Sequence, residues 1–149
     1  MTATNHAITG ALIAVTIDKP LIALPLAFLS HFVQDAIPHF GYAGHGGYKE
    51  GMKHRSLKFV MASDVVAFIP FVAVLWAGGA SIWVYIAAFL ALCPDLHDFI
   101  SFFVLHNQVQ DSKFSRFASS IQWCERPWGI GVEAFWYTGG MLLLINLLS

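Results

Sequence analysis

An apolar run that ends in histidine and aspartate side chains occupies residues 20–40, which read PLIALPLAFLSHFVQDAIPHF. If this run is helical, His31 and Asp35 are one turn apart and share a face, so an imidazole and a carboxylate project toward the same point. His39 follows directly after Pro38, at the end of the helix. Ionisable side chains are costly inside a membrane helix unless they are paired or used, so the stretch predicts a functional site.

The composition is that of an integral membrane protein. Of the 149 residues, 57% are hydrophobic and 11% are charged. The length predicts a single integral membrane domain, residues 1–149. A net charge of -1 gives no basic field, which argues against a nucleic-acid partner. The two cysteines lack CxxC spacing, so we expect free thiols.

The apolar segments predict an all-α, polytopic membrane helix bundle. A bilayer core about 30 Å thick needs roughly 20 apolar residues in a spanning helix. The sequence predicts about five transmembrane helices, covering approximately residues 5–17, 20–37, 56–76, 80–93 and 128–148. Pro94 is expected to break the fourth helix, with a further apolar piece after it. Aromatic residues spaced by three or four within residues 106–127 predict an amphipathic helix in the membrane interface. The glycine-rich residues 41–55 are predicted to be a loop that folds over the site as a flap.

The distribution of charge predicts the topology. Seven of the eight basic residues lie in or beside the connections that follow the second and fourth helices. The positive-inside rule then places these connections and the N-terminus in the cytoplasm, with the protein in the plasma (inner) membrane. Ionisable side chains from all five helices fall near that face: His6, His31, Asp35, His39, Asp64, Asp95, His97, Asp98 and Glu133. Their convergence predicts one polar site.

Histidine and aspartate together favour zinc, with iron or manganese as alternatives. We predict one or two divalent ions held by His6, His31, Asp35, His39, Asp95 and Asp98. Asp95 and Asp98 are three residues apart, so both can point to one side of a helix, whereas His97 would point elsewhere. Such a metal activates a water molecule, and a pair of metals can clamp a phosphoryl group.

A site at headgroup depth predicts a lipid or lipid-like phosphate as substrate, such as a phospholipid or an isoprenoid phosphate. Arg55 is a candidate to bind the phosphate oxygens, because arginine is the better bidentate partner. Glu133 is a candidate general base or bridging ligand. The predicted reaction is hydrolysis of a phosphoester by a metal-activated water.

Several short motifs of this chain resemble those of the bacterial membrane-bound metal-dependent hydrolases. They are the early His6, Ser30-His31-x-x-x-Asp35, His54-Arg55 and Pro94-Asp95-x-His97-Asp98. The stretch from His31 to His39 is also similar to a motif of zinc-dependent phospholipase C. The resemblance implies metal at His31, Asp35 and Asp95, with His6 and His54 as further ligands, and phosphoester hydrolysis.

Other interpretations of the same residues stay open. His31 and Asp35 also suit a structural pair inside a bundle, Asp95 and Asp98 suit a helix end, and Asp64 suits a hydrogen bond to a neighbouring helix. The alternative function is a non-enzymatic membrane protein, either an ion or proton pathway or a structural partner of another membrane protein. A pathway needs polar groups through the full depth of the membrane, whereas the outer halves of the predicted helices are almost purely apolar.

Overall fold

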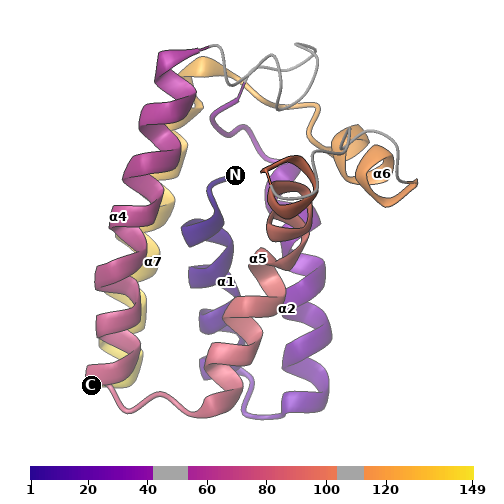
Figure 1. Cartoon of the computed structure of the whole chain (residues 1–149). Coiled ribbons are helices and arrows are strands. Elements are labelled where there is room, and N and C mark those ends of the chain that lie inside the picture. Colours follow the sequence, from indigo (N-terminus) through magenta and orange to yellow (C-terminus); the bar gives the residue numbers. More distant parts are fainter. Residues whose placement is uncertain (42–53, 104–112) are drawn as a thin grey trace.

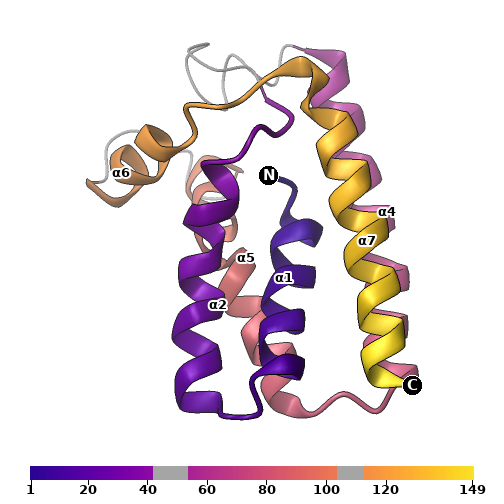
Figure 2. The same cartoon turned by 180° about the vertical axis from the view of Figure 1, so that it is seen from behind.

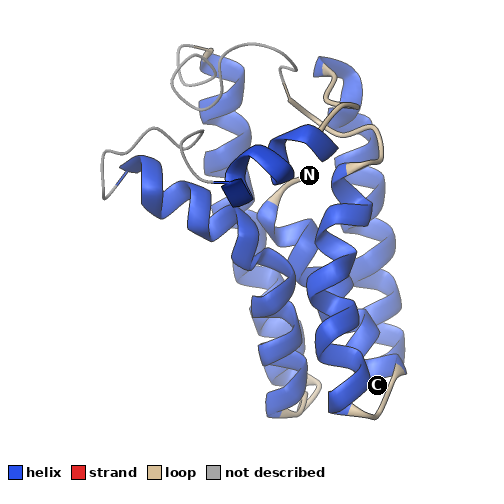
Figure 3. Ribbon diagram, turned by 90° about the vertical axis from the view of Figure 1, so that its right-hand side faces the viewer, coloured by secondary structure: helices blue, strands red, loops and turns tan. Residues whose placement is uncertain are grey.

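The computed structural model describes residues 1–41, 54–103 and 113–149, and these residues form a bundle of helices that run alternately up and down (Figure 1). The helices are α1 (Ala3–Thr16), α2 (Pro20–Asp35), α4 (Arg55–Ala77), α5 (Ile82–Phe103), α6 (Lys113–Ile121) and α7 (Ile130–Leu148), with the short 3-10 turn η2 (Pro127–Gly129) before α7. Figure 3 shows helices and loops but no strand in the described part of the chain. The prediction of an all-α protein is therefore confirmed.

Helix α1 is the central element of the bundle. It contacts α2, α5, α7 and α4, and the view from behind shows it between the α4 and α7 pair on one side and α2 and α5 on the other (Figure 2). The apolar core begins at the second turn of α1 and is shared with α4, α5 and α7. It consists of Ala7, Ile8, Ala11, Phe71, Leu75, Val84, Ala88, Met141 and Leu144. The first turns of α1 are also buried, although they carry polar side chains.

Small residues let α1 approach α5 closely. A Cβ atom added at Gly10 would lie 2.5 Å from the Ala87 carbonyl oxygen and 2.7 Å from the Ala91 Cβ atom. Only a glycine fits such a contact without moving one of the two backbones. The crossing at Gly10 therefore sets the distance between the helices that carry His6 and Asp95.

Two helical segments within the described residues are long and apolar enough to cross a membrane, not the five that the sequence predicts. They are Arg55–Ala77 and Pro127–Leu148. Helices α1 and α2 have 14 and 16 residues, which at a rise of 1.5 Å per residue makes each about 21 to 24 Å long. Both are shorter than a hydrocarbon core of about 30 Å. The apolar part of α5, Ile82–His97, is also shorter than a full span.

The predicted break of the fourth helix at Pro94 is wrong, because α5 continues through this proline to Phe103. A proline inside a helix removes one backbone hydrogen bond, and neighbouring turns can tolerate that loss with a bend. Asp95 and His97 therefore lie on one continuous helix. His97 is exposed whereas Asp95 is half-buried, as expected for regular helical spacing.

Helix α6 lies to one side of the bundle, beside α2 and at the end where the N-terminus is found (Figure 1). Its Phe114 and Phe117 rings lie 6.3 and 5.7 Å from the ring of Phe32 on α2. Part of its apolar face is thus packed on the protein, while Lys113 and Arg116 are exposed. The predicted interfacial helix corresponds to α6 over residues 113–121. Residues 42–53 of the predicted flap and residues 106–112 of the interfacial segment lie outside the described residues.

Candidate metal centre

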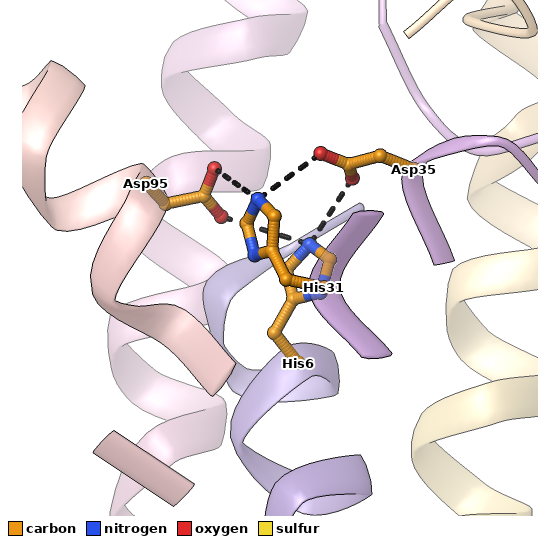
Figure 4. A group of neighbouring side chains, drawn as sticks. All are labelled: His6, His31, Asp35 and Asp95. Carbon is orange, nitrogen blue, oxygen red and sulfur yellow. Dashed lines mark hydrogen bonds and ion pairs between the residues drawn. The ribbon is translucent and has the colours of Figure 1, made fainter. Parts of the chain in front are cut away.

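Four side chains from three helices meet near the end of the bundle at which the chain begins (Figure 4). They are His6 of α1, His31 and Asp35 of α2, and Asp95 of α5. Each offers one ligand atom, and these four atoms all lie within 4.8 Å of one another. This group could hold a metal ion.

The two imidazoles face the two carboxylates through their Nε2 atoms (Figure 4). His6 Nε2 lies 3.1 Å from Asp35 Oδ1, and His31 Nε2 lies 3.2 Å from Asp35 Oδ2. The same two nitrogens lie 3.8 Å from the two oxygens of Asp95. Asp35 therefore lies between the histidines, and Asp95 faces both of them from α5.

The tautomer of His31 follows from its second nitrogen. His31 Nδ1 lies 2.8 Å from the Ala91 carbonyl oxygen. Because a carbonyl oxygen only accepts hydrogen bonds, Nδ1 carries the proton and donates it to Ala91. In the neutral ring the Nε2 lone pair is then directed at the carboxylates. Metal-binding histidines are commonly oriented by such a bond to a backbone carbonyl.

Gln34 fixes His6 in the same way. The Gln34 Nε2 amide donates to the Asn5 carbonyl oxygen at 3.4 Å and to the Met1 sulfur at 3.2 Å. This leaves Gln34 Oε1, 3.1 Å from His6 Nδ1, to accept the proton of the imidazole. Both rings therefore donate through Nδ1 to an oxygen atom and turn Nε2 toward Asp35 and Asp95.

Two further donors contact Asp35. The Met1 amino group donates to Asp35 Oδ1 at 2.6 Å, and the Gln122 amide donates to Oδ2 at 3.0 Å. Burial disfavours the charged amine, but the negative charges of Asp35, Asp95 and Glu133 outweigh it and raise the pKa of the Met1 amino group above its ordinary value. The surroundings of Asp35 thus favour the ionised carboxylate, which is the form that binds metal.

The spacing of the four groups suits a single ion. Ligand atoms 2.0 to 2.2 Å from a tetrahedral metal are about 3.4 Å from one another. The four imidazole-to-carboxylate distances, which use both oxygens of each aspartate, run from 3.1 to 3.8 Å, and one ligand atom from each residue lies within 4.8 Å of the others. The side chains of His6, His31 and Asp35 are almost fully buried, whereas Asp95 is 24% exposed. Access to the cluster is therefore from the Asp95 side.

His39, another predicted ligand, is not part of this group. His39 Nδ1 donates to the Ile37 carbonyl oxygen at 2.8 Å, and its Nε2 lies 4.0 Å from Glu125 Oε1. Its ring is thus turned to the segment that precedes η2. Burial and the positive Met1 amine lower the pKa of His39, and burial raises the pKa of Glu125. Asp98 belongs to α5, but its side chain lies outside the described part of the structure.

The two predicted catalytic residues lie on the helices that supply no ligand to the cluster. Glu133 of α7 is buried and accepts hydrogen bonds from Thr2, Asn5 and the Phe40 amide. Arg55 is exposed at the first residue of α4, at the same end of the bundle as the cluster (Figure 1). His54, implied as a ligand by the family resemblance, immediately precedes α4 and is outside the four-residue group. The catalytic roles of Glu133 and Arg55 stay predictions.

Sequence reasoning missed the residues that support the ligands. Gln34 is a polar residue among apolar neighbours and is three positions from His31 on the same helix. Residues three apart on a helix are neighbours, so this position could have been predicted to support the site. Gln122 had no such signal, because its contact with Asp35 joins segments 87 residues apart. The Met1 contact is made by a backbone amino group, so no pattern of side chains in the sequence could have predicted it.

Comparison with protein-family models, with curated proteins and with solved structures found no match to this chain.

Proposed function

We propose that this protein is a membrane-embedded, metal-dependent hydrolase that cleaves a phosphoester of a phospholipid or an isoprenoid phosphate. The observation that carries the proposal is the arrangement of His6, His31, Asp35 and Asp95, whose ligand atoms lie within 4.8 Å of one another. Zinc is the first candidate for the ion, and iron or manganese are the alternatives, because imidazole and carboxylate ligands suit all three.

The distribution of apolar side chains supports a membrane location. Large hydrophobic residues are exposed along the outer helices, including Leu21 on α2 at 92%, Val66 on α4 at 66% and Phe135 on α7 at 76%. The buried residues include His6, His31, Asp35 and Glu133. Water-soluble monomers rarely expose apolar surface on this scale, whereas a lipid bilayer is a suitable solvent for it. In this proposal α4 and α7 cross the bilayer and shield α1, with the N-terminal end of the bundle cytoplasmic.

The proposed chemistry assigns a task to each group. A bound divalent ion lowers the pKa of a coordinated water so that it becomes a nucleophile near neutral pH. His6, His31 and Asp35 would hold the ion in a buried position as three protein ligands, which leaves the fourth position, on the side of the partly exposed Asp95, for the water. Arg55 is the proposed partner for the phosphate oxygens, since a guanidinium can bind two of them at once.

The alternative of an ion or proton pathway is less well supported. The buried polar residues of the described chain gather around the first turn of α1 and the end of α2: Thr4, Asn5, His6, His31, Gln34, Asp35, His39 and Glu133. The interior next to the later turns of α1 is the apolar core that contains Ile8, Phe71 and Leu144. A conduit requires polar groups along its whole length, so this distribution favours a site at one end.

Metal analysis of the full chain, purified in a mild detergent, tests the proposal. We expect about one or two tightly bound transition-metal ions per chain in the wild type and loss of this metal in the double variant His31→Ala, Asp35→Ala. Ser30→Ala is the matched control, because Ser30 neighbours His31 on α2 but donates to the Ala27 carbonyl oxygen of its own helix. A wild type without bound metal would refute the metal centre.

Activity is tested on the same preparations. A phospholipid and an isoprenoid phosphate are presented separately in mixed micelles, and phosphate or phosphorylated product is measured. We expect hydrolysis by the wild type and by Ser30→Ala but not by the double variant. Metal binding without hydrolysis of either substrate would instead favour a non-enzymatic metal-binding protein.

A further inference from the structure

The first turn of α1 is buried although its backbone needs hydrogen-bond acceptors. The initial N–H groups of a helix have no partner inside the helix, and leaving them unpaired away from water is costly. Thr4, Asn5 and His6 are each 1% exposed or less. Thr2, at the N-cap position, makes no capping hydrogen bond with its side chain. The acceptors must therefore come from other parts of the protein.

Asp64 on α4 supplies the first set of acceptors. Its Oδ2 accepts from the Ala3 amide at 3.1 Å and its Oδ1 from the Thr4 amide at 3.2 Å. The Thr4 hydroxyl also donates to the Asp64 carbonyl oxygen at 3.0 Å. One carboxylate thus pairs with two successive amides, and its negative charge lies at the positive end of the α1 dipole.

Glu133 on α7 supplies the second set. Its Oε2 accepts from the Thr2 amide at 3.1 Å, from the Thr2 hydroxyl at 2.9 Å and from the Asn5 amide group at 2.6 Å. The Asn5 side chain also donates to the Glu133 carbonyl oxygen at 3.1 Å. Glu133 therefore holds the start of α1 from α7, the helix next to the one that carries Asp64, and its partners include the residue directly before His6.

These contacts join α4 and α7 to the group of helices formed by α1, α2 and α5. Helices α1, α2 and α5 carry the four candidate metal ligands, whereas α4 and α7 carry none of them. Helices α4 and α7 contact α1 and each other. The His6 amide in turn donates to the Thr2 carbonyl oxygen at 3.2 Å. A displacement of the first turn would therefore move His6 relative to His31 and Asp35.

We infer that Asp64 and Glu133 are positioning residues for the metal centre, which set the place of His6 by holding the first turn of α1 from α4 and α7. This inference rests on the proposed function, because it requires metal to bind at the four-residue group. It assigns Glu133 a role through His6 in place of the general-base role that the sequence suggests.

Isosteric amides provide the sharpest variants. The two bonds to the carboxylate oxygens of Asp64 and the Glu133 Oε2 contact with Asn5 all come from donors. An asparagine or glutamine at these positions would direct an NH₂ group at one of those donors without changing the volume. Asp64→Asn and Glu133→Gln are therefore measured in the full chain, with Co²⁺ alone as the probe of the metal centre.

We expect each amide variant to bind Co²⁺ on the order of tenfold more weakly than the wild type, as is typical when support of a metal ligand is lost. The visible absorption of the bound Co²⁺ is expected to change as well, because the place of the His6 imidazole differs. Tyr137→Phe is the matched control. It removes a 3.1 Å bond from α7 to the Ala67 carbonyl oxygen of α4 but leaves the first turn of α1 untouched.

The outcomes separate positioning from simple stabilisation. A folded Asp64→Asn or Glu133→Gln protein with the affinity and Co²⁺ spectrum of the wild type would overturn the inference, even if its stability were lower. If neither variant folds, Thr2→Val decides, since it removes only the hydroxyl bond to Glu133: weaker Co²⁺ binding supports the inference and unchanged binding overturns it. A wild type that binds no Co²⁺ would refute the metal centre itself, which is a different result.

Discussion

The imidazole rings of His6 and His31 are stacked, with their centroids 4.0 Å apart and their planes at 26°. Stacking brings the two Nε2 atoms to the same side, where both face Asp35. In the neutral rings these nitrogens present lone pairs to a carboxylate, an arrangement that could hold a cation between them. The group that could hold a metal ion is therefore built by contact between α1 and α2, and Asp95 of α5 completes it.

Loss of the Gln34 side-chain oxygen is expected to weaken metal binding. Gln34→Leu removes the acceptor for His6 Nδ1 and leaves this buried donor without its partner. We expect the affinity for Zn²⁺ to fall about 10- to 100-fold, as for other residues that orient a metal-binding histidine. Competition with a chelator of known affinity measures the change. Gln34→Glu keeps an oxygen at this position and should retain most of the affinity; equal affinities for all three proteins would contradict the role of Gln34.

A methyl group at Gly10 is expected to push α1 away from α5. Gly10→Ala places a Cβ atom 2.5 Å from the Ala87 carbonyl oxygen, and such overpacking costs about 1 to 3 kcal/mol of unfolding free energy. The matched control is Gly139→Ala, since a Cβ atom at Gly139 meets nothing within 4 Å and alanine is the better helix former. Denaturation in detergent micelles measures both. A Gly10→Ala protein as stable as Gly139→Ala would show that the two helices can separate at no cost.

A lysine at Val66 distinguishes lipid from water as the surroundings of α4. Val66 is 66% exposed at the middle of this helix. In a bilayer, a central lysine costs roughly 2.5 to 3.5 kcal/mol of insertion, whereas exposed surface changes in water are usually within about 0.5 kcal/mol. We expect Val66→Lys to reduce the membrane-inserted fraction strongly, as measured by carbonate extraction of membranes.

The control for this variant lies on the same helix. Phe59 is 73% exposed and is one turn from Arg55, so a lysine there can extend its amine to the membrane surface. Phe59→Lys should therefore insert nearly as well as the wild type. If Val66→Lys inserts equally well, α4 does not cross the bilayer.

The stability of the folded protein is expected to fall as the pH drops through the ordinary histidine range, because of His39. Its pKa is lowered from the usual 6.5 by burial and by the Met1 amine. Below pH 6.5 the unfolded chain binds a proton that folded His39 does not, so the unfolding free energy decreases by up to about 1.4 kcal/mol per pH unit until the folded pKa is reached. Denaturation in detergent at several pH values measures this slope.

A substitution of His39 separates its contribution to the pH dependence of stability from the contributions of the neighbouring charged groups. Glu125 has a raised pKa, so its contribution changes in the opposite direction and increases stability as the pH falls toward its own range. Asp35, Glu133 and the Met1 amine also act on His39 electrostatically. His39→Gln keeps all of these groups, and it should give a flatter loss of stability below about pH 6.5. An identical pH dependence in wild type and variant would rule out His39 as the cause.

Local chemistry made much of the fold predictable. The apolar runs, the glycines and the prolines at 20 and 38 indicated helices whose boundaries agree with α1, α2, α4 and α7 to within a few residues. The spacing of His31 and Asp35 placed both on one face, because a helix repeats every 3.6 residues. Pro94 was misleading: its local preference predicts a break, but packing of α5 against α1 and α2 keeps the helix continuous.

The sequence by itself determined that the chain is all-helical and that ionisable residues gather at one end, since both follow from periodicity and from the alternating direction of successive helices. Only the tertiary structure decided which of these residues meet. His6, His31, Asp35 and Asp95 converge because α1 crosses α5 closely at Gly10 and lies beside α2. In the folded protein His39 lies near Glu125. Asp64 and Glu133 accept hydrogen bonds from the start of α1. The physical reason is that the direction of a side chain depends on the rotation and separation of packed helices, which contacts distant in sequence determine.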